Sequence, residues 1–85
     1  MRFSALVEVR LRPGIADPEG ATIEAALPAL GFTGVDGVRV GKAIRLALDA
    51  ADADDARRRV EALCEQLLAN PVLEEAEVAL TEEEG

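Results

Sequence analysis

The chain has 85 residues, enough for one domain, and its formal net charge of −8 argues against a nucleic-acid-binding surface, which must be basic. It contains no histidine, so the commonest general base and the commonest metal ligand are missing, and it has neither tryptophan nor tyrosine. Hydrophobic residues make up 49% of the chain, but only Phe3 and Phe32 are aromatic, which predicts a shallow, aliphatic core that favours oligomerisation. Catalysis by the isolated chain is not expected.

Other features of the sequence concern the cellular compartment. Cys64 is the only cysteine and cannot form an internal disulfide, which favours a reducing environment. No apolar stretch approaches the ~20 residues that a membrane span needs. The N-terminus runs directly into a strand-like pattern and lacks the apolar run and cleavage site of a signal peptide. We therefore expect a cytoplasmic protein that contacts neither membranes nor nucleic acids.

The first predicted element is a strand over residues 3–11, in which apolar side chains alternate with mostly polar ones. Pro13 and Gly14 end it. A helix follows, with Asp17 as its N-cap and Pro18 at its first position. Its apolar residues Ile23, Ala26, Leu27 and Leu30 recur at helical spacing. Pro28 is expected to bend the helix near its end, and Gly31 to stop it.

Residues 35–49 allow two interpretations. Five large apolar residues of this stretch are even-numbered, so they share one face if the strand never turns back: Val38, Val40, Ile44, Leu46 and Leu48. We favour one long strand, bent or bulged at Gly41. The alternative is a hairpin turn at Gly41 and Lys42 that splits the stretch into two strands. A strand of about 13 residues would be ~40 Å long, more than two short helices can cover. We therefore expect a homodimer or a homotetramer.

The second predicted helix begins at Asp52 or Asp54 and ends before Asn70 and Pro71, a pair that stops helices. Its predicted apolar stripe comprises Ala56, Val60, Leu63, Cys64, Leu67 and Leu68. A last strand is predicted over residues 72–80, with Ala76, Val78 and Leu80 on one face. Residues 81–85 are predicted to form an acidic, frayed tail.

These elements predict an α+β fold, a single domain over residues 1–85. We expect a two-layer sandwich in which two helices cover one face of an antiparallel sheet. The element order is β-α-β-α-β with a long, bent middle strand, or β-α-β-β-α-β if that strand is split.

The candidate sites are for contact with partner proteins. Lys42 is the only lysine, and with Arg39 and Gly41 it forms a basic, open-backboned segment that a partner or an anion could contact. The alternative is a solvated bend in a strand. Asn70 is first a helix stop, but its amide could also serve as an interface donor. Cys64 is interpreted as a packing residue. We find no catalytic, cofactor-binding or metal-ligating constellation, and the glutamates after residue 73 are interpreted as a solvated acidic edge.

Three separated segments give the chain its resemblance to a known family, the PurS subunit of phosphoribosylformylglycinamidine (FGAM) synthase. They are Asp-Pro-Glu-Gly at residues 17–20, Gly-Val-Arg-Val-Gly-Lys at residues 37–42, and Cys-Glu-Gln-Leu-Leu-Ala-Asn-Pro-Val-Leu-Glu at residues 64–74. Their order and spacing make the resemblance specific, and it extends over residues 3–80. Pro28 departs from the family pattern.

The resemblance implies a non-catalytic small subunit of an ATP- and glutamine-dependent ligase complex, in the fourth step of purine biosynthesis. Such proteins form dimers or tetramers and join a large synthetase subunit (PurL type) and a glutaminase subunit (PurQ type). The implied role is to bridge these partners and support ammonia transfer, while ATP, Mg and glutamine are used by the partner subunits. By analogy, Arg39, Gly41, Lys42, Asn70 and Glu74 are implied as partner contacts. The alternative function is a dimeric regulatory module that binds a small molecule.

Overall fold

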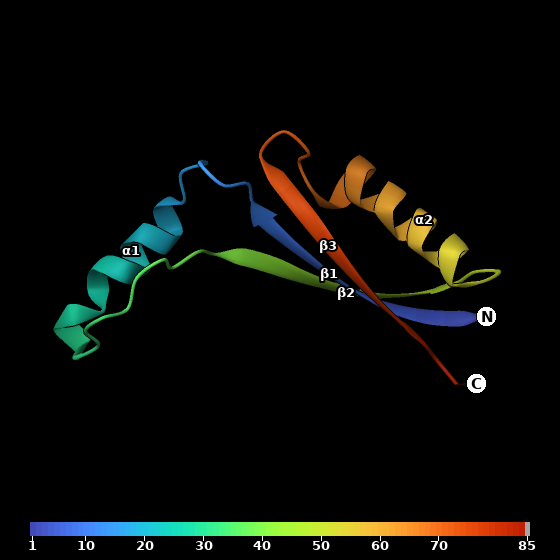
Figure 1. Ribbon diagram of the computed structural model, residues 1–85, viewed down its shortest axis with the longest axis horizontal. Helices are drawn as coiled ribbons and strands as arrows, with labels where there is room; N and C mark the ends of the chain where they lie inside the picture. The colour runs from blue at the N-terminus through green and yellow to red at the C-terminus, as the bar shows by residue number, and fades with distance from the viewer. Residues whose placement is uncertain (85) are drawn as a thin grey trace.

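Three antiparallel strands form one sheet in the order β2-β1-β3, and helices connect them (Figure 1). The computed structural model describes residues 1–84 of the chain. Its elements are β1 (Arg2–Leu11), α1 (Pro18–Ala26), the 3-10 helix η1 (Pro28–Leu30), β2 (Gly41–Asp49), α2 (Ala53–Leu63), the π-helix η2 (Cys64–Leu68) and β3 (Glu74–Glu82). The predicted α+β class and the β-α-β-α-β order are confirmed.

β1 is the central strand and supplies most of the core. Phe3, Ala5, Val7 and Val9 alternate along it and are all buried, as the sequence pattern predicted. Each of them faces a neighbour on both adjacent strands, and most of these neighbours are apolar. Val7, for example, pairs with Ile44 of β2 and with Val78 of β3. These cross-strand apolar pairs set the register, because a slip by one residue would turn the apolar side chains to the opposite face.

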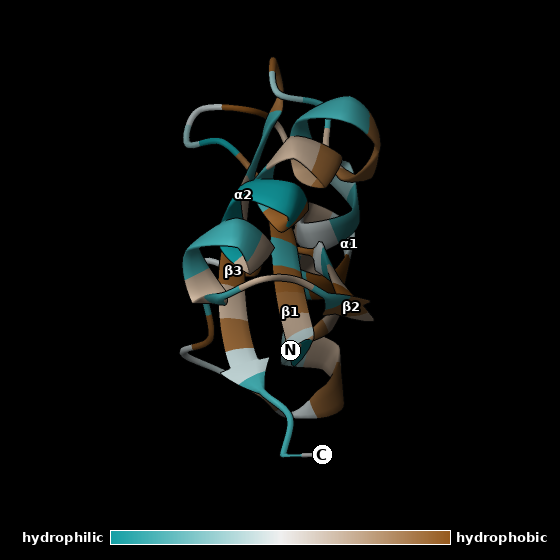
Figure 2. Cartoon of the chain, turned by 90° about the vertical axis from the view of Figure 1, so that its right-hand side faces the viewer, coloured by the Kyte–Doolittle hydropathy of each residue, from teal (hydrophilic) through white to brown (hydrophobic). Residues whose placement is uncertain are grey.

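α2 covers the apolar face of β1 and β3. Asp52 is its N-cap and accepts a hydrogen bond from the Asp55 amide at 2.8 Å. The helix buries Ala56 and Val60 toward the sheet, and Cys64 at the start of η2 is buried after them. Its outer surface is hydrophilic, whereas hydrophobic bands mark the strands (Figure 2). The amphipathic pattern of this helix therefore explains both its position and its orientation.

The last turn after α2 differs from the prediction. In η2 (Cys64–Leu68) the Ala69 amide donates to the Cys64 carbonyl, five residues back, at 3.0 Å. A π-turn holds one residue more than an α-turn, so the side chains that follow it are rotated around the axis. Leu68 and Ala69 consequently pack against the core. Leu67, which we predicted in the apolar stripe, is exposed.

The middle of the chain forms one strand that does not turn back, so the hairpin alternative is wrong. β2 begins at Gly41, which pairs with Arg10 of β1. Residues 35–40 lie before β2 and run beside α1 without joining the sheet of the single chain (Figure 1). The strand is therefore shorter than predicted at its N-terminal end, because β1 ends at Leu11 and offers no partner beyond it.

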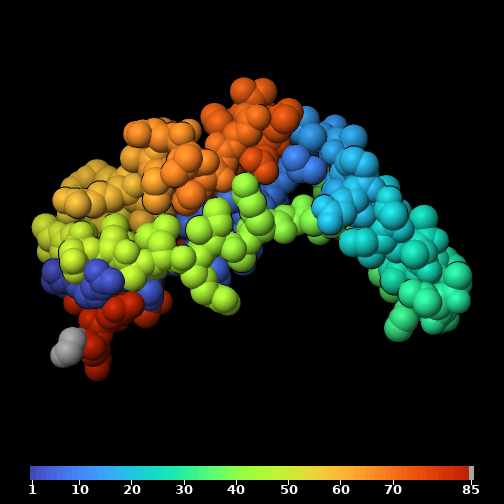
Figure 3. All heavy atoms as spheres, turned by 180° about the vertical axis from the view of Figure 1, so that it is seen from behind, coloured from blue at the N-terminus to red at the C-terminus, as the bar shows by residue number. Residues whose placement is uncertain are grey.

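α1 projects away from the sheet. Together with the loops on either side it forms an arm (residues 12–40), and the molecule is an arch with extents of 51 × 29 × 15 Å (Figures 1 and 3). Ile23 and Leu30, both predicted on the apolar face of this helix, are exposed. The prediction that two helices cover the sheet is therefore right for α2 and wrong for α1. α1 instead packs beside residues 37–40.

The remaining boundaries lie close to their predicted positions. α1 ends at Ala26, and Pro28 begins a separate 3-10 turn that Gly31 closes in a left-handed conformation (φ 92°). β3 is displaced by two residues and extends to Glu82, so the segment predicted as a frayed tail begins as strand. Gly85 lies outside the described residues. Within residues 1–84, no helix is long and apolar enough to cross a membrane.

Candidate partner-binding surface

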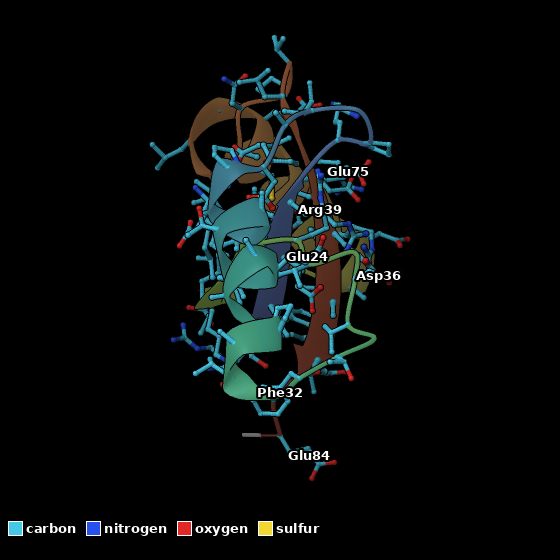
Figure 4. All side chains as sticks on the ribbon, turned by 90° about the vertical axis from the view of Figure 1, so that its left-hand side faces the viewer. Glu24, Phe32, Asp36, Arg39, Glu75 and Glu84 are labelled. Carbon is cyan, nitrogen blue, oxygen red and sulfur yellow. The ribbon has the colours of Figure 1, made fainter. Side chains whose placement is uncertain are left out.

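Two carboxylates hold the arm in place. Asp17 accepts hydrogen bonds from the Gly20 amide at 2.8 Å, as an N-cap, and from the Val40 amide at 2.7 Å. Glu24 accepts a third, from the Val38 amide at 3.0 Å (Figure 4). The Asp17 side chain is only 6% exposed, and the hydrogen bonds from Gly20 and Val40 hold its pKa below the ordinary value. α1 therefore lies beside residues 37–40 because its carboxylates satisfy amides that no neighbouring strand satisfies.

Gly20 is needed because the two segments lie so close together. A Cβ added at this buried glycine would lie 2.5 Å from the Val38 carbonyl oxygen and 2.8 Å from Oδ2 of Asp17. Both distances are far below van der Waals contact. The Asp-Pro-Glu-Gly segment is thus explained by capping and close packing.

Three of the predicted contact residues meet at the end of the sheet where the arm begins. Gly41 and Lys42 of β2 and Glu74 of β3 line a hollow of about 230 Å³. Its other lining residues are Val9, Arg10, Leu11, Glu19 and Val40. Lys42 is exposed and lies opposite Val9, on the face of β2 that also carries Ile44. The structure therefore brings the only lysine beside two glutamates at an open corner of the molecule.

Gly41 has a geometric role at this corner. A Cβ at this position would lie 2.7 Å from the carbonyl oxygen of Val9 on the neighbouring strand. The first residue of β2 must therefore lack a side chain for the backbones to approach each other this closely.

Arg39 lies next to this corner but is engaged within the chain. Its Nη2 donates to the Ile15 carbonyl at 3.2 Å, and its Nε lies 4.0 Å from Oδ2 of Asp17. Figure 4 shows it between α1 and the strands. About half of the side chain stays exposed. Arg39 thus helps to join the two ends of the arm, and it stays a predicted partner contact.

Asn70 and Glu74 form one tightly bonded turn. The Asn70 carbonyl accepts from the Leu73 amide at 3.1 Å and from the Glu74 amide at 2.7 Å. Oε1 of Glu74 accepts from the Asn70 amide at 2.8 Å, and Oδ1 of Asn70 accepts from the Val72 amide at 3.1 Å. Glu74 also lines the hollow beside Lys42, so this turn and the Lys42 corner adjoin.

Two arginines at this end of β1 were not singled out by sequence reasoning. Arg10 lies 2.8 Å from Glu77 and 3.4 Å from Glu75, and these hydrogen bonds raise its pKa. Arg12 donates to the Pro71 carbonyl from Nε at 3.1 Å and from Nη2 at 2.9 Å, so it braces the turn at residues 70–74. Glu75 lies near both guanidinium groups. The signal was the pairing of charges on neighbouring strands, which cannot be recognised before the strand register is known.

The described residues offer surfaces for contact. Across residues 1–84, no three His, Cys, Asp or Glu side chains form a cluster that could hold a metal ion. Cys64 is buried, and this burial, with the nearby Glu61 carboxylate, raises the pKa of its thiol and disfavours the nucleophilic thiolate. The chain is a small α+β domain with an open, charged corner at one end of its sheet.

Comparison with known proteins agrees with this class. The family model PurS, described as phosphoribosylformylglycinamidine (FGAM) synthase, matches residues 4–82. The chain is 42% identical over 83 residues to the FGAM synthase subunit PurS of Synechocystis sp., covering 98% of this chain and 83% of that protein. It therefore belongs to the PurS family.

Solved structures give the same result. The PurS subunit of the Methanocaldococcus jannaschii formylglycinamide ribonucleotide amidotransferase matches with a TM-score of 0.86 and 35% identity, covering 96% of this chain and 99% of that one. A chain in the PurLQS structure from Thermotoga maritima matches with a TM-score of 0.88 and 37% identity, covering 95% of this chain and 99% of that one. The arm and its separation from the sheet are thus part of a fold that this family shares.

Proposed function

We propose that this chain is the small, non-catalytic subunit of FGAM synthase in the cytoplasmic pathway of purine biosynthesis. In this role it bridges a large synthetase subunit and a glutaminase subunit and supports the transfer of ammonia between them. The partner subunits use ATP, Mg and glutamine, and this chain supplies contact surfaces. The observation that carries the proposal is membership of the PurS family, together with the likeness to a chain of the PurLQS structure.

Association with further copies of this chain is part of the proposal. The apolar face of β2 (Ile44, Leu46 and Leu48) is only half-buried, and Ile23, Leu30 and Phe32 on the arm are exposed. Incompletely covered apolar side chains on both the sheet and the arm favour a dimer or a tetramer in which each copy covers part of the other. Light scattering at micromolar concentration is expected to give such an oligomer, and a strict monomer would contradict this part of the proposal.

The bridging role has a direct test. The chain is mixed with purified synthetase and glutaminase subunits, and FGAM formation is measured with glutamine and, separately, with ammonia as the nitrogen donor. We expect glutamine-dependent synthesis to require this chain and ammonia-dependent synthesis to proceed without it. If neither activity depends on the chain, the bridging role is wrong, and small-molecule binding by calorimetry becomes the next measurement.

Lys42 provides a residue-level test of the contact surface. Lys42→Glu reverses one exposed charge at the open corner and is expected to weaken assembly about tenfold, the value of a lost charge-assisted contact. Arg45→Glu is the matched control, because it makes the same charge change on the opposite face of the same strand. Equal assembly of both variants would remove Lys42 from the proposed contact surface.

A further inference from the structure

A second exposed surface lies at the turn between α2 and β3. We define the α2–β3 tip by Leu67, Val72 and Leu73, which are 74%, 77% and 42% exposed. They belong to the segment at the top of Figure 1, which caps the arch in Figure 3. Three large apolar side chains displayed within seven residues of sequence are unusual for a surface turn, and such groups commonly mark protein contacts.

Leu67 is exposed because of the backbone and not because of its place in the helical pattern. A regular α-helix would place Leu67 in the buried stripe with Val60. The π-turn η2 rotates it outward and packs Leu68 and Ala69 inward instead. Turns of this kind occur frequently at functional sites.

The tip is also rigid. Four hydrogen bonds between Asn70 and the residues up to Glu74 close the turn. Arg12, the residue after β1, holds the turn through its side chain on the Pro71 carbonyl and its amide on the Leu73 carbonyl, the latter at 2.9 Å. A turn fixed in this way presents Val72 and Leu73 in one arrangement, so a partner that covers them loses little free energy in ordering the surface.

An acidic groove of about 330 Å³ adjoins the tip. Its lining includes the turn residue Pro71 and four glutamates, Glu61, Glu65, Glu74 and Glu75, against one guanidinium, that of Arg12. Glu75 pairs with Arg10 and Arg12, and Glu61 pairs with Arg57. Glu65 and Glu74 form no ion pair within residues 1–84, so these two carboxylates give the groove its negative charge. A complementary partner carries positive side chains next to an apolar one.

We propose that the α2–β3 tip and this groove together bind a segment of a partner subunit in which an apolar anchor is flanked by lysine or arginine. The inference rests on the proposed function, since it takes the partner to be the synthetase or the glutaminase subunit. A second copy of this chain fits less well, because a twofold contact between two tips would bring two sets of glutamates together.

The test measures the affinity of the full-length chain for each purified partner subunit by calorimetry, at low and at high salt. Leu67→Ser combined with Val72→Ser is expected to weaken binding to one partner at least about tenfold, as for a central apolar anchor. Leu67→Met keeps an apolar side chain and is expected to bind normally. Because these side chains are exposed, unchanged thermal midpoints serve as the check that the variants fold.

The charge component is tested with Glu65→Lys. We expect weaker binding and a smaller dependence of affinity on salt, whereas Glu84→Lys, with the same charge change near the C-terminus, is expected to bind normally. If the wild-type chain binds both subunits and the serine variant binds them equally well, the tip inference is wrong and the proposed function stands. Failure of the wild-type chain to bind either subunit overturns both. A serine variant that only changes the homo-oligomer would identify the tip as a contact between copies and would also overturn the inference.

Discussion

Gly20→Ala tests whether close packing or helix propensity dominates in the arm. Alanine is favoured over glycine inside a helix by about 1 kcal/mol, which alone would stabilise α1. The new Cβ, however, would lie 2.5 Å from the Val38 carbonyl oxygen. Relief of this contact requires a movement of about 1 Å to reach van der Waals separation. That movement breaks the hydrogen bond from the Val38 amide to Glu24, which is 3.0 Å long.

The balance between these effects gives the expected result. Loss of a hydrogen bond to a charged group costs about 1.5–3 kcal/mol, which exceeds the gain in helix propensity. We expect Gly20→Ala to destabilise the arm by about 1–2 kcal/mol and to speed hydrogen exchange of the Val38 amide roughly 5–30-fold, measured by NMR.

Ala21→Gly is the matched control, because Ala21 is an exposed position of the same helix. It is expected to destabilise α1 by about 1 kcal/mol through propensity alone. If packing dominates, both variants destabilise the arm. If Gly20→Ala instead slows exchange, so that the two variants have opposite signs, the reasoning from close packing is refuted.

Because the folded state lowers the pKa of Asp17, its contribution to stability is complete above pH ~4 and is lost as the pH falls through the lowered pKa. The difference in thermal midpoint between the wild type and Asp17→Asn should therefore narrow in acid, and a constant difference would contradict this. Cys64 should react with a thiol reagent slowly in the folded chain and quickly in urea, and equal rates would mean that it is not buried. Gly41→Ala should lower the free energy of unfolding by about 1–3 kcal/mol, because the new Cβ would meet the Val9 carbonyl oxygen, and the denaturant midpoint should fall with it. An unchanged midpoint would show that the strands can separate there.

The candidate contact residues illustrate how far sequence reasoning reaches. Lys42 was identifiable as the only lysine, interrupting an apolar face, and the structure places it opposite Val9 as that pattern requires. That Glu74 lies at the same hollow could not be foreseen, because the two residues meet through β1, which lies between their strands. Arg12 was missed for the same reason, since its bond to Pro71 spans 59 residues of sequence.

The sequence alone determined the local elements. Asp17 and Asp52 begin helices, Gly31 ends the turn after α1, and the alternation in β1 names its buried face, because caps, left-handed glycines and periodicity act over a few residues.

Only the tertiary structure decided where α1 lies and which way Leu67 points. The position of α1 is set by two carboxylates, Asp17 and Glu24, that accept hydrogen bonds from distant amides. The direction of Leu67 is set by a π-turn that lets Leu68 and Ala69 pack against the core. Both outcomes depend on contacts between residues far apart in the chain, whose free energies outweigh a short-range pattern.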